Sequence, residues 1–118
     1  MHSSAKVFLL SGDAFYARFY SIFLHHMGYE NTSSFYNSLE CLNKLKDKPD
    51  VIFLDAAKEK KTNDNLIESI RLVNRNVPIV MLADENLAKP EGVVVLPKTG
   101  ITPELMGETL ETLLNSSN

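Results

Sequence analysis

The chain has 118 residues, a hydrophobic content of 44% and a net charge of −3. This length suits a single domain spanning 1–118, and the apolar content is high enough for a buried core, which excludes a disordered chain. The charge balance argues against nucleic-acid binding, because domains that bind phosphate backbones usually carry a basic excess.

Cys41 is the single cysteine, which excludes an internal disulfide and is typical of a reducing cytoplasm. No apolar run reaches the ~18 residues needed to span a membrane, and the N-terminus does not look like a signal peptide. We therefore expect a cytoplasmic protein that does not associate with membranes. Within its own segment, Cys41 is best explained as a small packing residue and not as a nucleophile.

The first half of the chain is predicted to form an apolar strand, an amphipathic helix, a weaker strand and a second amphipathic helix, in this order. Lys6–Leu10 is the first predicted strand, and Asp13 is placed to cap the helix that follows it. Asn31–Tyr36 is a second, more polar strand, expected at an edge of the sheet. The predicted apolar face of the first helix consists of Phe15, Phe19, Ile22, Phe23 and Met27, and that of the second consists of Leu39, Leu42 and Leu45.

The second half contains three apolar strands, Asp50–Asp55, Ile79–Ala83 and Val93–Leu96. A polar loop over 56–65 and a helix through Leu66, Ile67, Ile70 and Val73 separate the first two of these strands. The last helix has Thr102 as its cap and Pro103 at its first position, while Gly107 in its middle should weaken it slightly. Strands alternating with helices predict a parallel α/β sheet with helices on both faces.

One crossover of this sheet is unusually short. Only Asp84–Gly92 lies between the fourth and fifth strands, whereas a complete crossover with its helix needs at least ~10–12 residues. We therefore predict at most one or two helical turns around Asp84–Ala88, which means that the fourth helix is truncated.

Asp55 at the end of a buried strand, together with Lys98 after the fifth strand, resembles the active-site pattern of receiver domains in bacterial two-component response regulators, of the chemotaxis-regulator type. The resemblance extends from about Lys6 to Leu114. It implies a five-stranded flavodoxin-like sheet of order 2-1-3-4-5 between two helical layers. It also implies that Asp55 is the phosphoacceptor, that Lys98 contacts the phosphoryl group, that Mg²⁺ is bound, and that a histidine kinase or another signalling protein is the partner.

Several family positions are not filled in the usual way. The acidic pair that ligates Mg²⁺ falls on Ser11 and Gly12, and Asp13 comes one residue too late for a ligand unless the loop swings it inward. The two switch positions, a hydroxyl residue and an aromatic residue in the family, are Ala83 and Val95. These departures predict a degenerate receiver, with Asp55 and Asp13 as metal ligands only if a weak Mg²⁺ site survives.

Two smaller departures follow the strands. Thr99 stands where the family has a proline after its lysine. Lys58–Asn63 replaces the Pro- and Gly-rich segment after the phosphoacceptor, and Asn63 is a residue able to adopt the left-handed conformation otherwise left to glycine.

We therefore expect a pseudo-receiver, a non-enzymatic docking module with weak or no Mg²⁺-dependent phosphorylation and no small-molecule ligand. Its docking face would be the last helix, the fifth strand and the short crossover. The alternative within the family is a fully phosphorylatable receiver. A small phosphohydrolase with Asp55 as nucleophile is disfavoured because the second aspartate it needs is Ala57. A flavin-binding module is disfavoured because Ser11–Ala14 has too few Ser, Thr or Gly residues to cradle a phosphate.

Overall fold

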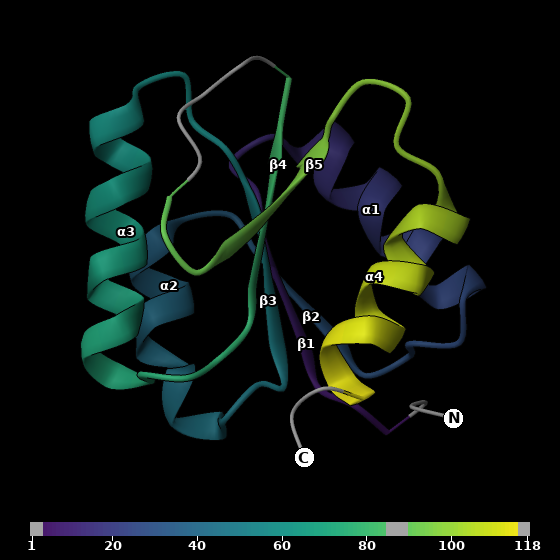
Figure 1. Ribbon diagram of the computed structural model, residues 1–118, viewed down its shortest axis with the longest axis horizontal. Coiled ribbons are helices and arrows are strands. Elements are labelled where there is room, and N and C mark those ends of the chain that lie inside the picture. The colour runs from purple at the N-terminus through teal and green to yellow at the C-terminus, as the bar shows by residue number, and fades with distance from the viewer. Residues whose placement is uncertain (1–3, 85–89, 116–118) are drawn as a thin grey trace.

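The computed structural model describes residues 4–84 and 90–115. Within them the chain forms strands and helices in strict alternation until the fourth strand (Figure 1). The elements are β1 (Val7–Leu10), α1 (Ala14–His26), β2 (Thr32–Phe35), α2 (Ser38–Asn43), a 3-10 turn (Leu45–Asp47), β3 (Val51–Asp55), α3 (Lys60–Val73), β4 (Ile79–Ala83), β5 (Val93–Pro97) and α4 (Pro103–Asn115). No helix in these two ranges is both long and apolar enough to cross a bilayer.

The five strands form one parallel sheet of order β2-β1-β3-β4-β5, as predicted. In β1, β3 and β4 nearly every side chain is buried, because helices cover both faces of these strands. β2 is different: it contains Thr32, Ser33 and Ser34, and it lies at one end of the sheet. The polar composition of β2 thus correctly predicted an edge strand.

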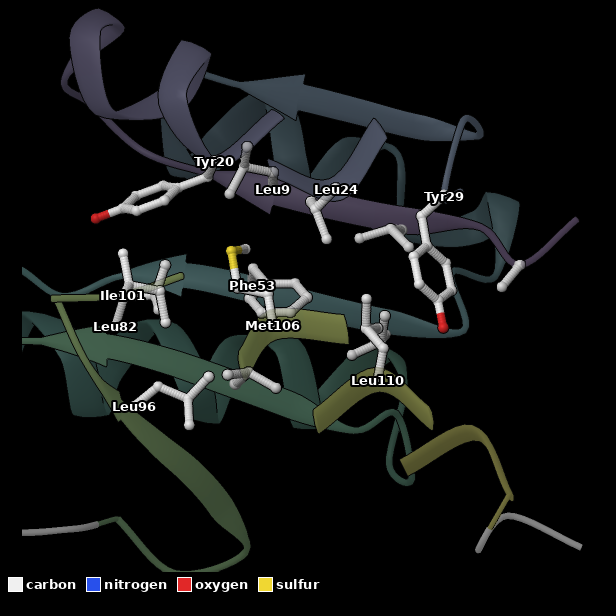
Figure 2. Close-up of a cluster of buried hydrophobic side chains, with 14 residues drawn as sticks. Leu9, Tyr20, Leu24, Tyr29, Phe53, Leu82, Leu96, Ile101, Met106 and Leu110 are labelled. Carbon is white, nitrogen blue, oxygen red and sulfur yellow. The ribbon is translucent and has the colours of Figure 1, made fainter. Parts of the chain in front are cut away.

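Each face of the sheet has its own helical layer and its own core. α1 and α4 cover one face, and α2 and α3 cover the other (Figure 1). Figure 2 shows the core beneath α1 and α4, where Leu24 of α1, Phe53 of β3 and Met106 of α4 point toward one another, while the Tyr20 ring lies above Ile101 and Leu82. Burial of these large side chains contributes about 1.5–3 kcal/mol each to folding, so the two helices are firmly anchored to the sheet.

The predicted apolar face of α1 is wrong for three of its five residues. Phe15, Phe19 and Ile22 are exposed, whereas the side that meets the sheet consists of Ala17, Tyr20 and Leu24. The reason is that α1 is apolar on almost its whole circumference, so hydrophobic spacing cannot identify the inner side. Phe23 and Met27 do pack against the core.

Two further residues assigned to inner faces are exposed. Leu39 lies in the first turn of α2 and Val73 is the last residue of α3, and both face solvent. Helix ends extend past the sheet, so a side chain there stays exposed even when its position fits the periodicity.

The loop predicted over 56–65 is less than half as long as expected and covers only 56–59, because α3 already begins at Lys60. Its first residues are lysines and Glu59 makes no side-chain cap, so the usual start signals are missing. Asn63 is not left-handed; it lies inside α3, buried, and its amide accepts from Ala57 N at 2.7 Å and donates to Ala57 O at 3.0 Å. These two bonds hold the turn after β3 against the helix.

Gly107 allows α1 and α4 to approach closely. A Cβ atom at this position would lie 2.6 Å from Met27 Cε, well inside van der Waals contact. Gly107 weakens α4 slightly, but its missing side chain allows α1 and α4 to pack tightly against each other.

The short crossover connects β4 to β5 without a helix in its described part. The prediction of one or two helical turns around Asp84–Ala88 falls largely on residues 85–89, outside the described ranges. The described part of the chain therefore has four α-helices beside the five strands, where the full flavodoxin-like pattern has five.

Candidate functional site

The carboxyl ends of three strands bring the predicted site residues together. Asp55 is the last residue of β3, Ser11 directly follows β1, and Lys98 directly follows β5. In a parallel sheet these carboxyl ends lie at one edge, which is where ligands of open α/β sheets bind. These residues are far apart in the sequence, and the fold brings them close together in space.

The carboxylate of Asp55 is engaged on both oxygens. Lys98 Nζ lies 2.9 Å from Oδ1, and Ser11 Oγ donates a hydrogen bond of 2.8 Å to Oδ2. The Asp55 side chain is only 6% exposed and that of Lys98 17%, so this is a largely buried ion pair. Lys98 therefore pairs directly with Asp55 in the structure.

The ion pair also determines the charge state of Lys98. Burial disfavours the ammonium form, but the hydrogen bond and negative charge of Asp55 outweigh it, so the pKa of Lys98 is raised above its usual value. Lys98 is therefore a fixed positive charge at neutral pH.

Tyr16 covers the ion pair from the side of α1, and the sequence analysis missed it. Lys98 Nζ lies 4.2 Å from the centre of the Tyr16 ring, within the range of a cation–π contact. The ring in turn stacks on Tyr20, with their centres 5.9 Å apart. The signal for this contact was weak, since Tyr16 is one of several aromatic residues in α1.

The Tyr20 hydroxyl is buried in the same region and has no hydrogen-bond partner within the described part of the chain. Burial raises the pKa of Tyr20 strongly, and the charge of Asp55 adds to this shift. Tyr20 therefore stays protonated at physiological pH.

The three residues after β1 do not act alike. Ser11 is buried against Asp55, whereas Gly12 is exposed and carries no side chain. Asp13 caps α1: its Oδ1 accepts from Phe15 N at 2.9 Å and from Tyr16 N at 3.3 Å. The predicted role of Asp13 as helix cap is confirmed. Because the Asp13 carboxylate is turned toward the start of α1, it is Asp55 that pairs with Lys98.

Neither switch position has a polar side chain. Ala83 is buried at the end of β4, and its carbonyl accepts from Lys98 N at 3.1 Å. Val95 is half-buried in β5 and packs on the α2–α3 side of the sheet. Thr99 is bonded elsewhere, since its hydroxyl donates to Asp84 Oδ1 at 2.8 Å and ties the end of β5 to the end of β4.

Possible metal ligands do not gather elsewhere in residues 4–84 and 90–115. No group of three or more His, Cys, Asp or Glu side chains there is close enough to hold an ion. Cys41 is fully buried, and burial raises the pKa of its thiol to about 11, as expected for a packing residue.

Known proteins resemble this chain in structure. No protein-family model matches its sequence, and no curated protein matches it by sequence. A protein described as related to pilus assembly, from Burkholderia pseudomallei, has a TM-score of 0.84 at 12% identity, with 100% of this chain and 95% of that chain covered.

Two further solved structures are described as a chemotaxis protein and as a response regulator receiver domain protein. Chemotaxis protein CheY4 of Vibrio cholerae has a TM-score of 0.77 at 25% identity, covering 93% of this chain and 98% of that chain. A response regulator receiver domain protein from Clostridium thermocellum has a TM-score of 0.81 at 16% identity, covering 95% of each chain. The resemblance to response regulator receiver domains is thus confirmed, and the chain has their fold.

Proposed function

We propose that this chain, which has the fold of response regulator receiver domains, is a single-domain pseudo-receiver that acts through protein contacts. The observation that carries the proposal is the closed state of Asp55. Its two oxygens are taken by Lys98 and Ser11, and Tyr16 lies over the lysine. The chain's own side chains thus satisfy the carboxylate that a receiver offers to a phosphoryl group and a metal.

The donor set around Asp55 fits Mg²⁺ poorly. Mg²⁺ favours octahedral oxygen ligands and gives up its waters reluctantly, so one carboxylate and one hydroxyl are a weak set. Asp13, the acidic residue next to the acidic-pair positions Ser11 and Gly12, uses its carboxylate to cap α1. An ion would also have to compete with the ammonium group of Lys98 for Asp55 Oδ1.

A phosphorylation switch requires two states that the modification favours to different extents. Ala83 offers no hydroxyl to a phosphoryl group, and Val95 offers no aromatic side chain to change position. We infer that any phosphorylation of Asp55 is weak and changes the docking surface little. One observation supports the alternative, a fully phosphorylatable receiver: both Asp55 and Lys98 are present at the expected positions.

The partner we propose is a histidine kinase or another signalling protein in the cytoplasm, bound without catalysis by this domain. The candidate docking face comprises α4, β5 and the connection before β5. A nucleic-acid partner is disfavoured by the net charge of −3.

The proposal is tested by incubating the chain with a small-molecule phosphodonor and Mg²⁺ and measuring its intact mass. We expect no gain, or a slow and partial gain, of one phosphoryl group. Rapid stoichiometric gain that is lost in Asp55→Asn would favour the phosphorylatable receiver instead.

The matched variant restores the family's acidic pair through Ser11→Asp and Gly12→Asp together. If the missing carboxylates cause the weak reaction, this double variant gains phosphorylation at Asp55 over the unmodified chain. A Mg²⁺ titration followed by the NMR shifts of Asp13 and Asp55 measures metal binding separately. Saturable shifts at low Mg²⁺ in the unmodified chain would contradict the poor fit.

A further inference from the structure

The outer edge of β2 is open, and apart from the short length of the strand, four residues, it lacks the usual features that prevent strand pairing. β2 is the terminal strand of the sheet within the described residues. The segment from Asn31 to Leu39 contains no charged residue and no proline. Natural edge strands are usually protected by a lysine, a proline, a bulge or a covering segment, so an unprotected edge is a candidate for strand addition.

The direction of the free backbone groups follows from the pairing with β1. Val7 N donates to Asn31 O, and Ser11 N donates to Phe35 O. Backbone groups alternate in direction along a strand, so the odd-numbered residues of β2 face β1. The N–H and C=O groups of Thr32 and Ser34 therefore point away from the sheet.

A groove lies along this edge on each face of the sheet. The groove on the α1 side is lined by Phe15, Arg18 and Ile22 together with Ser34 and Tyr36. The groove on the α2 side is lined by Glu40, Asn43 and Lys44, again with Ser34. An added strand would direct alternate side chains into the two grooves, because its side chains also alternate between faces.

Exposed apolar side chains line this edge on the α1 side. Phe15, Ile22 and Tyr36 line the groove there, and their exposed fractions are 69%, 54% and 56%. At about 150–250 Å² for a large side chain, they expose on the order of 300 Å² per copy, or about 600 Å² for two copies. The paired strands and the polar residues of both grooves would supply the rest of the ~1,200 Å² of a specific interface.

A second copy of the chain fits this edge by symmetry. A two-fold axis perpendicular to the sheet makes β2 pair antiparallel with β2 of the second copy and keeps like helices on the same face. α1 covers both β1 and β2, so the two α1 helices would lie about 10 Å apart, the spacing of packed helices. Phe15 and Ile22, which line the groove beside β2, would then lie at this contact.

Charge is also complementary in this arrangement. The same axis sets the two α2 helices antiparallel, so Glu40 of one copy faces Lys44 of the other, twice by symmetry. On the other face α1 has no acidic residue, and Arg18 can stack on Tyr36 of the second copy.

We propose that the outer edge of β2, with the grooves beside it, is a dimerisation surface through which two copies form one continuous ten-stranded sheet. This surface is separate from the Asp55 site and from the docking face of α4 and β5. The proposal therefore does not depend on whether Asp55 is phosphorylated.

The experiment measures mass by sedimentation over a range of protein concentrations, together with amide hydrogen exchange. We expect a concentration-dependent shift toward twice 13.2 kDa. We also expect slower exchange of the Thr32 and Ser34 amides in the dimer, because these N–H groups become bonded across the interface. Exchange of the Ser33 and Phe35 amides, which face β1, should not depend on concentration.

Two variants interrupt the interface in different ways. Ser34→Pro removes an outward N–H group and keeps the β1 ladder, whereas Ile22→Glu places a charge on the exposed face of α1. Each should raise the dimer dissociation constant at least about tenfold. Leu72→Glu is the matched control, since Leu72 is exposed on α3 and lines neither groove, and it should leave dimerisation unchanged.

Each outcome decides the matter. A chain that stays monomeric at the highest concentration overturns the proposal and would leave the β2 edge to an extended segment of another protein. A dimer unaffected by both variants, with unchanged Thr32 and Ser34 exchange, also overturns it, because the interface then lies elsewhere. Circular dichroism verifies that Ser34→Pro is folded, and Ile22→Glu tests the same surface without altering the strand.

Discussion

The Asp55 site and the outer edge of β2 satisfy their polar groups in opposite ways. At the Asp55 site, Lys98 and Ser11 of the same chain bind both carboxylate oxygens. At the edge of β2, the outward backbone groups of Thr32 and Ser34 face no strand within the described part of the chain.

The difference shows where binding free energy is available. A ligand that approaches Asp55 must first separate a largely buried ion pair, and a buried charge that loses its partner costs about 3–5 kcal/mol. A strand that approaches β2 displaces only water from groups already aligned for pairing. Contacts at the sheet edge are therefore energetically easier for this domain than chemistry at Asp55.

The largest expected effect comes from opening the closed site with Lys98→Met. This change leaves the Asp55 carboxylate buried without its cation and should reduce the free energy of unfolding by about 2–3 kcal/mol, somewhat less than for a fully buried pair. Urea unfolding measures the loss. The control is Lys98→Met with Asp55→Leu, which removes both charges and should recover most of the stability; no recovery would mean that the ion pair is not the cause.

Asn63→Ala should have the next largest effect. It removes both side-chain bonds to the backbone of Ala57 and leaves a buried N–H and C=O without partners, at a cost of about 2 kcal/mol. Thermal unfolding measures this cost. Asn65→Ala, two residues further along α3, is the control; an equal loss there would indicate a general effect on the helix.

The pH dependence of the ion pair should be visible at alkaline pH. The pKa of Lys98 is raised in the folded state, so its stabilising effect is complete below the unfolded pKa of about 10.4. The effect is lost as the pH rises through the higher folded value. We expect the stability difference between the unmodified chain and Lys98→Met to be constant near neutral pH and to shrink in the alkaline range. A difference that does not change with pH would contradict the assignment to the lysine charge.

Replacing Tyr16, whose ring lies over Lys98, should have a smaller effect on stability. Tyr16→Leu removes the ring over Lys98 and should reduce stability by about 0.5–1 kcal/mol, the usual range of a cation–π contact at a partly exposed position. Tyr16→Phe keeps a ring and should lose little. Chemical unfolding of both variants separates the ring from the hydroxyl, and equal losses would count against the cation–π contact.

The smallest effect is expected at the open edge. Ser34→Ala at a protein concentration that keeps the chain monomeric should change the free energy of unfolding by no more than about 0.5 kcal/mol, because the side chain is exposed. A loss comparable to that of Asn63→Ala would show that the edge is already engaged within the monomer.

The strand pattern and the resemblance to receivers together predicted most of the fold. Continuous apolar runs such as Ile79–Ala83 are typical of buried parallel strands, and the polar β2 was correctly placed at the edge. The caps at Asp13 and Thr102 were also predictable, since their side chains bond to backbone groups only two or three residues away. These features depend on local chemistry, which a sequence records directly.

The candidate site was predictable only in part. Asp55 and Lys98 stand at recognisable positions after their strands, and the fold brings them together as expected; their roles toward a phosphoryl group remain predictions. Tyr16 was missed and Asn63 was given a different role, because the importance of each depends on a contact, with Lys98 and with Ala57, that no periodicity indicates.

By itself, the sequence determined which segments are strands, where two helices begin, and which acidic residues stand at the site. Only the tertiary structure decided which side of α1 is buried, that Ser11 and Lys98 share the two oxygens of Asp55, and that the edge of β2 lies open between two grooves. The physical reason is the range of the interactions. Caps and strand patterns arise between near neighbours, whereas burial and ion pairing depend on groups that meet only after the sheet has assembled.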